Sequence, residues 1–292
     1  MNRVLNKLQI NPKKIKIKNN IRIIEDENNK FVIKENKKRK EDIYKYLESR
    51  NFNNFPRVYT NELDNYDVLE YINEVNILEE QKLTDMIYLL TILHTKTTFY
   101  KEIDLDEIKK IYEDQVNYLN YLSSYYNDIN MLIENETYMS PNNYLLIRNI
   151  TDIYSIINIG YEYINKWYDE VKTRKTLRYT LNHNNLKSSH LLEDNNNIYF
   201  INWKYSDFGF NVNDLYNLYL NNFENIELDT ILNIYDSKYK LENYEYYFLI
   251  ASLCNIKKID LNNNLSGIKD TYLLLEYIKG ILKHILKDNS KK

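Results

Sequence analysis

One stretch decides the fold: residues 183–203, which read HNNLKSSHLLEDNNNIYFINW. It holds two short apolar segments, Leu191-Leu192 and Ile198 to Ile201, around a polar turn rich in asparagine. Short apolar runs on either side of such a turn predict a β-hairpin. The surrounding non-helical island runs from Arg178 to Phe210. Because active sites usually lie on loops held by a rigid scaffold, we expect the chemistry of the protein in this island.

On both sides of the island, apolar residues recur with the spacing of amphipathic helices. The clearest case is residues 83–98, where Met86, Leu89 and Leu93 share one helix face, and Thr84 is expected to cap the start of this helix. The scarcity of glycine (4) and proline (3) also favours a mainly helical chain. Further helices are predicted at residues 105–133, 142–172, 215–220, 228–235, 244–254 and 267–286.

The first 75 residues have a different character. A helix with a charged first turn is predicted from residue 41, between segments rich in β-branched and aromatic residues. The order strands, helix, strands predicts a small antiparallel sheet with one inserted helix, with strands in residues 14–34, 55–59 and 66–72. We therefore divide the chain into an N-lobe, residues 1–75, and a helical C-lobe, residues 76–292, which carries the hairpin island 178–210.

The composition excludes several classes of protein. A net charge of −3 gives no general attraction to nucleic acid or to an anionic membrane. We attribute the 30 tyrosines to an A+T-rich genome, whose codons favour this residue. Because they follow helical spacing and do not alternate with a basic stripe, a role in stacking on nucleic-acid bases is not expected. No apolar stretch of about 18 residues is present, so no membrane span is expected. Residues 1–18 lack the apolar segment of a signal peptide, and the single cysteine, Cys254, suits a reducing cytosol, so we expect a cytoplasmic protein.

The island carries a characteristic order of motifs. After the loop and hairpin come Ile201-Asn202-Trp203 and then Asp214-Leu215, which opens a helix. This order resembles the aminoglycoside phosphotransferases and choline kinases, particularly the bacterial spore-coat CotS-like branch, whose loop H-G-D-x-x-x-x-N precedes a hairpin, I-D-W and a D-L pair. The matching frame consists of His183, Leu186, Leu191, Leu192, Ile201, Trp203, Asp214 and Leu215.

The resemblance implies an α+β fold: a bilobal, protein-kinase-like fold with a small β-rich N-lobe containing one helix and a large, mainly helical C-lobe. It also implies structural roles for His183, Trp203 and Asp214. Asp214 would cap its helix and brace the catalytic loop, and we expect its side chain to be buried.

The polar positions of the family motif are changed. By the resemblance, Asn185 replaces the catalytic Asp, His190 replaces the metal-binding Asn, and Asn202 replaces the second metal ligand, an Asp. A neutral amide cannot act as general base, and the loss of a positioned base costs about 10²–10⁴-fold in rate. Mg²⁺ is held through carboxylate oxygens, and its loss removes charge stabilisation that phosphoryl transfer needs. We expect no intact catalytic residue and no phosphate transfer.

Residues 207–209 spell Asp-Phe-Gly, the DFG motif of protein kinases. The motif lies beyond Trp203, which anchors the match, so we interpret Asp207 as a turn residue beside a flexible glycine. If its side chain turned inward, Asp207 could still serve as a metal ligand. His183 and His190 have no cysteine or carboxylate at the spacing of a zinc site.

A candidate nucleotide site involves the N-lobe. Lys34 ends a strand-like segment and resembles the lysine that grips nucleotide phosphates, with Glu41 or Glu48 as its ion-pair partner, although a solvated charged edge would look the same. Glu70, Tyr71 and Ile72 would line an adenine-sized cleft, and an ordinary core strand would look identical. The first glycine is Gly160, so the N-lobe has no glycine-rich phosphate loop.

Three functions follow from these observations. The first is a pseudokinase that serves as a binding or assembly module, associated with the spore surface if the CotS-like resemblance holds. The second is an active small-molecule kinase whose metal is held by Asp207, His190 or Glu193. The third is a helical interaction protein with a coincidental motif, which the absence of a five-stranded small lobe would favour. No cofactor is expected, although weak ATP binding stays open, and the partner would be an unidentified protein or a small polar ligand.

Overall fold

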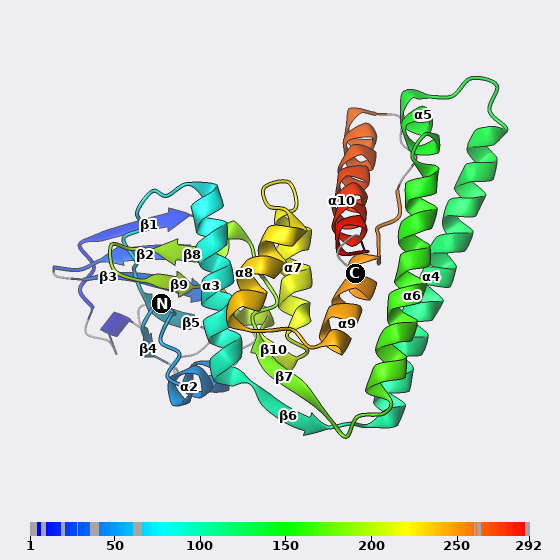
Figure 1. Ribbon diagram of the computed structural model, residues 1–292. Helices are drawn as coiled ribbons and strands as arrows, with labels where there is room; N and C mark the ends of the chain where they lie inside the picture. Colours follow the sequence, from blue (N-terminus) through cyan, green and yellow to red (C-terminus); the bar gives the residue numbers. More distant parts are fainter. Residues whose placement is uncertain are drawn as a thin grey trace. The chain divides into compact units, whose positions relative to one another are not determined.

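The computed structural model describes residues 5–6, 10–18, 21–27, 29–35, 41–60, 66–259, 261 and 264–289. The chain forms two compact units (Figure 1). The small unit comprises residues 1–97 and 187–206, and the large unit comprises residues 98–186 and 207–292. The island 178–210 contributes to both units, and its hairpin belongs to the small unit.

A five-stranded antiparallel sheet forms most of the small unit, in the order β1-β2-β3-β5-β4. Its strands are β1 (Lys14–Lys18), β2 (Ile21–Glu25), β3 (Lys30–Glu35), β4 (Val58–Thr60) and β5 (Tyr66–Glu70). The register pairs Ile24 with Phe31 and Ile33 with Val68. Because cross-strand partners share a face, these side chains form one buried cluster, together with Leu5 and Ile10. The presence of this sheet argues against the third alternative.

Two helices complete the small unit: α2 (Glu41–Ser49) and α3 (Glu79–Thr97). The predicted cap at Thr84 was wrong, because α3 begins earlier, with acidic residues in its first turn that favour a helix start. Thr84 lies inside the helix, where its hydroxyl donates a hydrogen bond to the carbonyl of Glu80 (3.0 Å). The strand expected at residues 55–59 begins only at Val58, since Pro56 has no N–H for a strand ladder.

The hairpin consists of β8 (Leu191–Glu193) and β9 (Ile198–Phe200), flanked by the 3₁₀ turns η1 (Ser188–His190) and η2 (Trp203–Tyr205). Two backbone bonds attach it to the rest of the small unit. The Phe200 N–H donates to the carbonyl of Asn54, and the Val75 N–H donates to the carbonyl of Glu193, both at 2.9 Å. These bonds join the hairpin to the small unit, which also includes the residues on either side of the hairpin, 187–206 in all.

The large unit contains the helices α4 (Leu105–Glu134), α5 (Pro141–Ile147), α6 (Ile150–Val171), α7 (Val212–Asn222), α8 (Leu228–Lys238), α9 (Asn243–Leu253) and α10 (Leu265–Asn289). It also has a three-stranded sheet in the order β10-β7-β6, formed by β6 (Phe99–Glu102), β7 (Thr176–Asn182) and β10 (Asp207–Gly209). The helix predicted at 142–172 divides at Arg148 and Asn149. The long helices of this unit and the sheet of the small unit confirm the predicted α+β class.

The core of the large unit lies where α6 packs against α9 and α4. Trp167 on α6 contacts Phe248 on α9, with ring centroids 4.9 Å apart. Gly160 lets the helices approach closely, because a Cβ at this position would lie 2.9 Å from Leu119 Cδ2 and 3.0 Å from Cys254 Cβ. Cys254 is fully buried in this packing.

Cys254 is expected to be inert in the folded protein. Burial raises the pKa of its thiol far above the ordinary value, and the thiolate is the reactive species. With a chromogenic disulfide reagent at pH 8, we expect no labelling under native conditions and one thiol per chain after unfolding. Rapid labelling of native protein would show that α9 opens readily.

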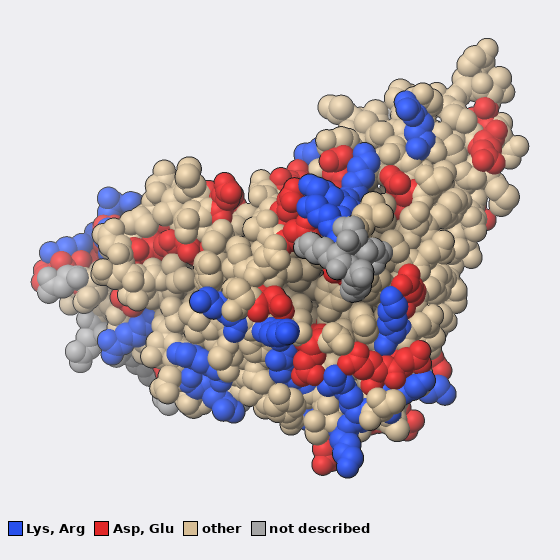
Figure 2. Space-filling view, in the orientation of Figure 1, with Lys and Arg blue, Asp and Glu red and all other residues tan. Residues whose placement is uncertain are grey.

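Among the residues described, no helix is both long and apolar enough to cross a membrane. On the face that Figure 2 shows, acidic and basic side chains are interspersed over the described residues. This mixture fits the small net charge of the whole chain. The absence of a nucleic-acid partner stays a prediction.

Candidate functional site

Three of the predicted site residues meet in the small unit. Lys34, on β3, donates a hydrogen bond from Nζ to Oδ1 of Asn202 at 2.9 Å. The Asn202 Nδ2 lies 3.2 Å from Nε2 of His190, so the imidazole nitrogen accepts the amide proton. We call these three residues the lysine–amide cluster. It joins side chains that are 168 positions apart in the sequence.

The hairpin fixes the geometry of the lysine–amide cluster. The Ile201 N–H donates to the carbonyl of His190 at 3.0 Å, which holds the two ends of the hairpin together. Asn202 has a left-handed backbone (φ 68°, ψ 51°), a conformation that asparagine tolerates better than most residues. The next residue, Trp203, is buried against Phe52, with ring centroids 6.0 Å apart. Trp203 therefore anchors the position from which the Asn202 amide reaches Lys34.

The electrostatic environment of Lys34 is unfavourable to its charge. Lys34 lies on the sheet face opposite the buried cluster and is itself half-buried. Burial is the main cause that lowers the pKa of Lys34 below its ordinary value; Asp67 opposes this effect and Lys204 adds to it. Asp67 faces Lys34 in the β3–β5 register. Sequence reasoning missed Asp67 and Lys204, although Lys204 directly follows the Trp203 anchor.

Of the two acidic partners predicted for Lys34, Glu48 is exposed on α2, and the side chain of Glu41 lies outside the described part of the structure, so that pairing stays a prediction. Within the described residues, the Lys34 ammonium donates to the neutral amide of Asn202. An ammonium bonded to an amide keeps its full positive charge, because the amide carries no opposite charge.

The residues predicted to line an adenine cleft have unequal exposure. Glu70 is exposed at the end of β5, Tyr71 is half-buried and Ile72 is buried. The backbone here continues the sheet, because the Tyr71 N–H donates to the carbonyl of Lys30 at 3.1 Å. Of the three side chains, Glu70 and Tyr71 are accessible and Ile72 belongs to the buried core. Their role in nucleotide binding stays a prediction.

The loop at residues 183–185 lies in the large unit and is held by Asp214 on α7. Both Asp214 oxygens accept backbone N–H bonds from this loop, from His183 at 2.7 Å and from Asn184 at 2.6 Å. His183 and Asp214 are fully buried, while Asn185 is half-buried. Asn184 has a left-handed backbone (φ 57°), which asparagine tolerates better than most residues. The bracing of this loop by a buried Asp214 agrees with the prediction, and the assignment of Asn185 to a catalytic position stays a prediction.

Asp207 lies on β10 in the large unit, where its backbone pairs with Asn182 on β7. Its carboxylate is exposed and accepts the Phe208 N–H at 2.9 Å. The turn interpretation of Asp207 was wrong, because residues 207–209 form a strand. Glu193, the other carboxylate considered as a ligand, is buried on β8, where burial and the neighbouring Asp85 raise its pKa. Within the described residues, no group of three His, Cys, Asp or Glu side chains could hold a metal ion.

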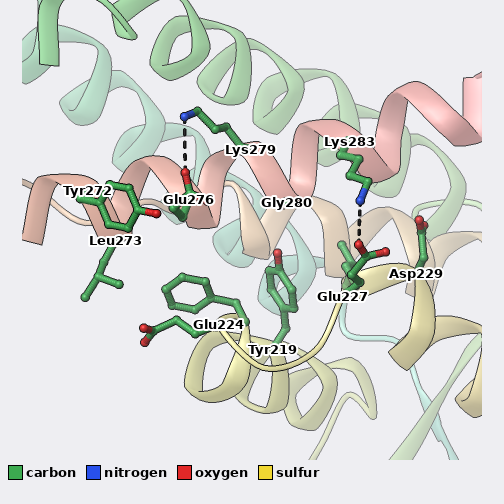
Figure 3. Close-up of a pocket in the computed structure, with 12 residues that line it drawn as sticks. Tyr219, Glu224, Glu227, Asp229, Tyr272, Leu273, Glu276, Lys279, Gly280 and Lys283 are labelled. Atoms are coloured by element: carbon green, nitrogen blue, oxygen red, sulfur yellow. Dashed lines mark hydrogen bonds and ion pairs between the residues drawn. The ribbon is translucent and has the colours of Figure 1, made fainter. Parts of the chain in front are cut away.

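A pocket lies in the large unit, between the α7–α8 region and α10 (Figure 3). Its volume is about 430 Å³. Its carboxylates come from Glu224, Glu227, Asp229 and Glu276, and its aromatic side chains from Tyr219, Phe223 and Tyr272. Two lysines offset part of the negative charge: Lys283 pairs with Glu227 at 2.7 Å and Lys279 with Glu276 at 3.4 Å. Sequence reasoning did not single out this pocket, because α7 and α10 are far apart in the chain.

No known protein family matches the sequence, and no curated protein matches it. Solved structures do share its fold. An aminoglycoside phosphotransferase from Alicyclobacillus acidocaldarius matches with a TM-score of 0.67 and 12% identity, over 96% of this chain and 93% of that one. The AMP-bound spectinomycin phosphotransferase APH(9)-Ia matches with a TM-score of 0.56 and 12% identity, over 96% and 98%. The choline kinase LicA from Streptococcus pneumoniae matches with a TM-score of 0.51 and 15% identity, over 99% and 97%.

These likenesses define the class of fold: a kinase-like α+β fold with a small sheet-containing lobe and a large helical lobe. Within that class, the fold is the one shared by aminoglycoside phosphotransferases and choline kinases. The fold implied by the motif order around residues 183–215 is therefore confirmed.

Proposed function

We propose that the protein is a pseudokinase of the aminoglycoside phosphotransferase-like superfamily, which binds a ligand or a protein partner without transferring phosphate. One observation carries the proposal. The Lys34 ammonium donates to a neutral amide at position 202, where the family motif has a metal-binding Asp. The fold supplies the framework of a phosphotransferase, and the lysine–amide cluster lacks the negative charge that the reaction needs.

The chemistry of phosphoryl transfer explains why these changes matter. Catalysis relies on positioning and on electrostatic stabilisation of the phosphoryl group by bound Mg²⁺. Asn202 offers one neutral oxygen, which already accepts a hydrogen bond from Lys34. Asn185 cannot accept the proton of an attacking hydroxyl. The loss of that base alone lowers a rate by about 10²–10⁴-fold.

The test is phosphate transfer with and without restored carboxylates. Wild-type protein with MgATP is expected to phosphorylate none of a panel of aminoglycosides, choline and ethanolamine above the level of buffer. Combining Asn185→Asp, His190→Asn and Asn202→Asp should produce Mg²⁺-dependent ATP hydrolysis about tenfold or more above wild type, a small part of what a base contributes. The matched control combines N185A, H190A and N202A. Transfer by wild-type protein that is lost in N185A would refute the proposal.

An active small-molecule kinase is the second candidate. The observation that favours it is the exposed Asp207 carboxylate on β10, which could supply one metal ligand. Under this alternative, wild-type protein would show MgATP turnover that D207A abolishes and N185A leaves unchanged. The same assay therefore separates the two candidates.

The finer assignments are part of the proposal. The CotS-like branch rests on the order of motifs from His183 to Leu215, and association with the spore surface and a bacterial origin follow only from that branch. An unidentified protein or a small polar ligand is the proposed partner, and the cytoplasm is the proposed location. The AMP-bound complex belongs to spectinomycin phosphotransferase, and it supports a test of nucleotide binding in this chain.

A further inference from the structure

We infer that the lysine–amide cluster, together with Lys204, binds the phosphate groups of a nucleotide directly, without a divalent cation. The inference rests on the proposed function, because it assigns a ligand to the same catalytically inactive site. It departs from the fold family, in which a metal ion is implied between protein and phosphate. All four residues, Lys34, His190, Asn202 and Lys204, lie in the small unit.

The residues present do not fit Mg²⁺. This ion requires oxygen ligands, preferably carboxylates, in octahedral geometry. The Asn202 Oδ1 faces the Lys34 ammonium at 2.9 Å, so a cation on this oxygen would meet a second positive charge. The Asn202 Nδ2 is a donor and faces His190 Nε2 at 3.2 Å. The cluster therefore offers a metal one neutral oxygen beside an ammonium.

The same groups suit an anion. Among the described residues, Asp67 favours the charge of the Lys34 ammonium and Lys204 opposes it. An Asp at position 202 would neutralise the ammonium at hydrogen-bond distance, and the neutral Asn202 leaves its charge in place. Charge-assisted hydrogen bonds from ammonium groups to phosphate oxygens are among the strongest polar contacts in proteins. A phosphate that accepts hydrogen bonds from Lys34 would supply the negative charge that the family obtains from its carboxylate.

The surroundings of Lys34 support this interpretation. The residue is half-buried, and burial and Lys204 act against its charge while Asp67 favours it. A bound phosphate would offset the cost of burying the ammonium through its negative charge. Free ATP carries more negative charge than MgATP, and excess Mg²⁺ should therefore compete with the protein for the nucleotide.

The experiment is calorimetric titration of the full-length protein with ATP, ADP, pyrophosphate and adenosine, each in EDTA and in excess Mg²⁺. ATP is expected to bind in EDTA and to bind more weakly in Mg²⁺, and adenosine is expected not to bind. Lys34→Gln should weaken binding by about tenfold or more, the scale of one hydrogen bond to a charged group. Lys45→Gln, an exposed lysine on α2, is the matched control and should leave the affinity unchanged.

Asn202→Asp provides the sharpest variant, because it restores a carboxylate without changing side-chain size. It should abolish binding in EDTA and produce binding in Mg²⁺, which reverses the metal dependence of wild type. Unchanged unfolding temperatures of the ligand-free variants would show that each is folded. If wild-type protein binds ATP only with Mg²⁺, or binds adenosine as well as ATP, the inference is wrong.

The outcomes for the inference and for the pseudokinase proposal are separable. Metal-free binding without phosphate transfer supports both. Binding that requires Mg²⁺, or no binding at millimolar nucleotide, with no transfer, overturns the inference and leaves the pseudokinase proposal standing. Mg²⁺-dependent binding with transfer overturns both.

Discussion

Replacing Glu245 by alanine is expected to lower the free energy of unfolding by about 3–5 kcal/mol, the usual effect of removing one partner from a buried ion pair. Glu245, on α9, is 1% exposed. Its carboxylate accepts from Nε of Arg178, on β7, at 2.8 Å and also from Nη2 of the same guanidinium. Arg178 lies over the ring of Tyr239 and would lose its carboxylate partner in a largely buried position.

A second contribution comes from the start of α9. The Glu245 side chain also accepts the backbone N–H of Glu242 at 2.8 Å and completes a capping box. Loss of a helix cap costs about 1 kcal/mol. Glu245→Gln keeps an acceptor for this N–H but removes the charge, so it should destabilise less than alanine does.

Urea denaturation followed by circular dichroism measures this effect. A double-mutant cycle with Arg178→Met isolates the energy of the pair. The control is Glu113→Ala, which removes an exposed partner of Lys109 and should change stability by about 0.5 kcal/mol or less. A change below about 1 kcal/mol for Glu245→Ala would contradict the assigned role of the pair.

Replacing Asp214 by alanine is expected to destabilise the protein by about 2–5 kcal/mol, because it removes the acceptor of two backbone N–H groups, each costing about 1–3 kcal/mol when left unsatisfied. These N–H groups belong to His183, which is fully buried, and to Asn184. Asn184 has a left-handed backbone, so the loop depends on this support. Asp214→Asn should also destabilise, since its amide NH₂ would face one of the two donors.

The matched control for Asp214 is Asp236, an exposed aspartate whose Oδ1 accepts the Leu241 N–H at 2.7 Å. Asp236→Ala should cost less than about 1 kcal/mol, because water can replace its carboxylate. Hydrogen exchange of the His183 and Asn184 amides gives a local readout. If these amides stay protected in D214A, another group supports the loop and the role assigned to Asp214 is wrong.

Several elements of the fold could be predicted because their signals are local. The hairpin follows from two apolar segments around a polar turn that the Asp194 carboxylate closes by accepting the N–H groups of Asn196 and Asn197 at 2.8 Å. Boundaries were less predictable. The apolar periodicity continued through Arg148 and Asn149, so it predicted one helix where the structure has two, α5 and α6. Likewise, α3 gains a first turn of acidic residues that no apolar pattern marks.

For the candidate site, the sequence predicted which side chains are neutral, but it did not predict which side chains contact one another. That Asn185 and Asn202 supply no carboxylate and no general base follows from the residue type alone. An acidic partner of Lys34 was expected on α2, at Glu41 or Glu48, and the hydrogen bond from Lys34 to Asn202 was not expected. Asp67 and Lys204 act on Lys34 through space, and neither belongs to a motif.

The sequence alone determined the class of fold and the neutral side chains at positions 185 and 202, because periodicity, turn composition and side-chain chemistry are properties of neighbouring residues. Only the tertiary structure decided that Lys34 bonds to Asn202 and that Arg178 is paired with Glu245. Each of these contacts joins segments that are distant in the chain. Their geometry depends on how strands, hairpin and helices pack, and the energy of a buried charge depends on that packing.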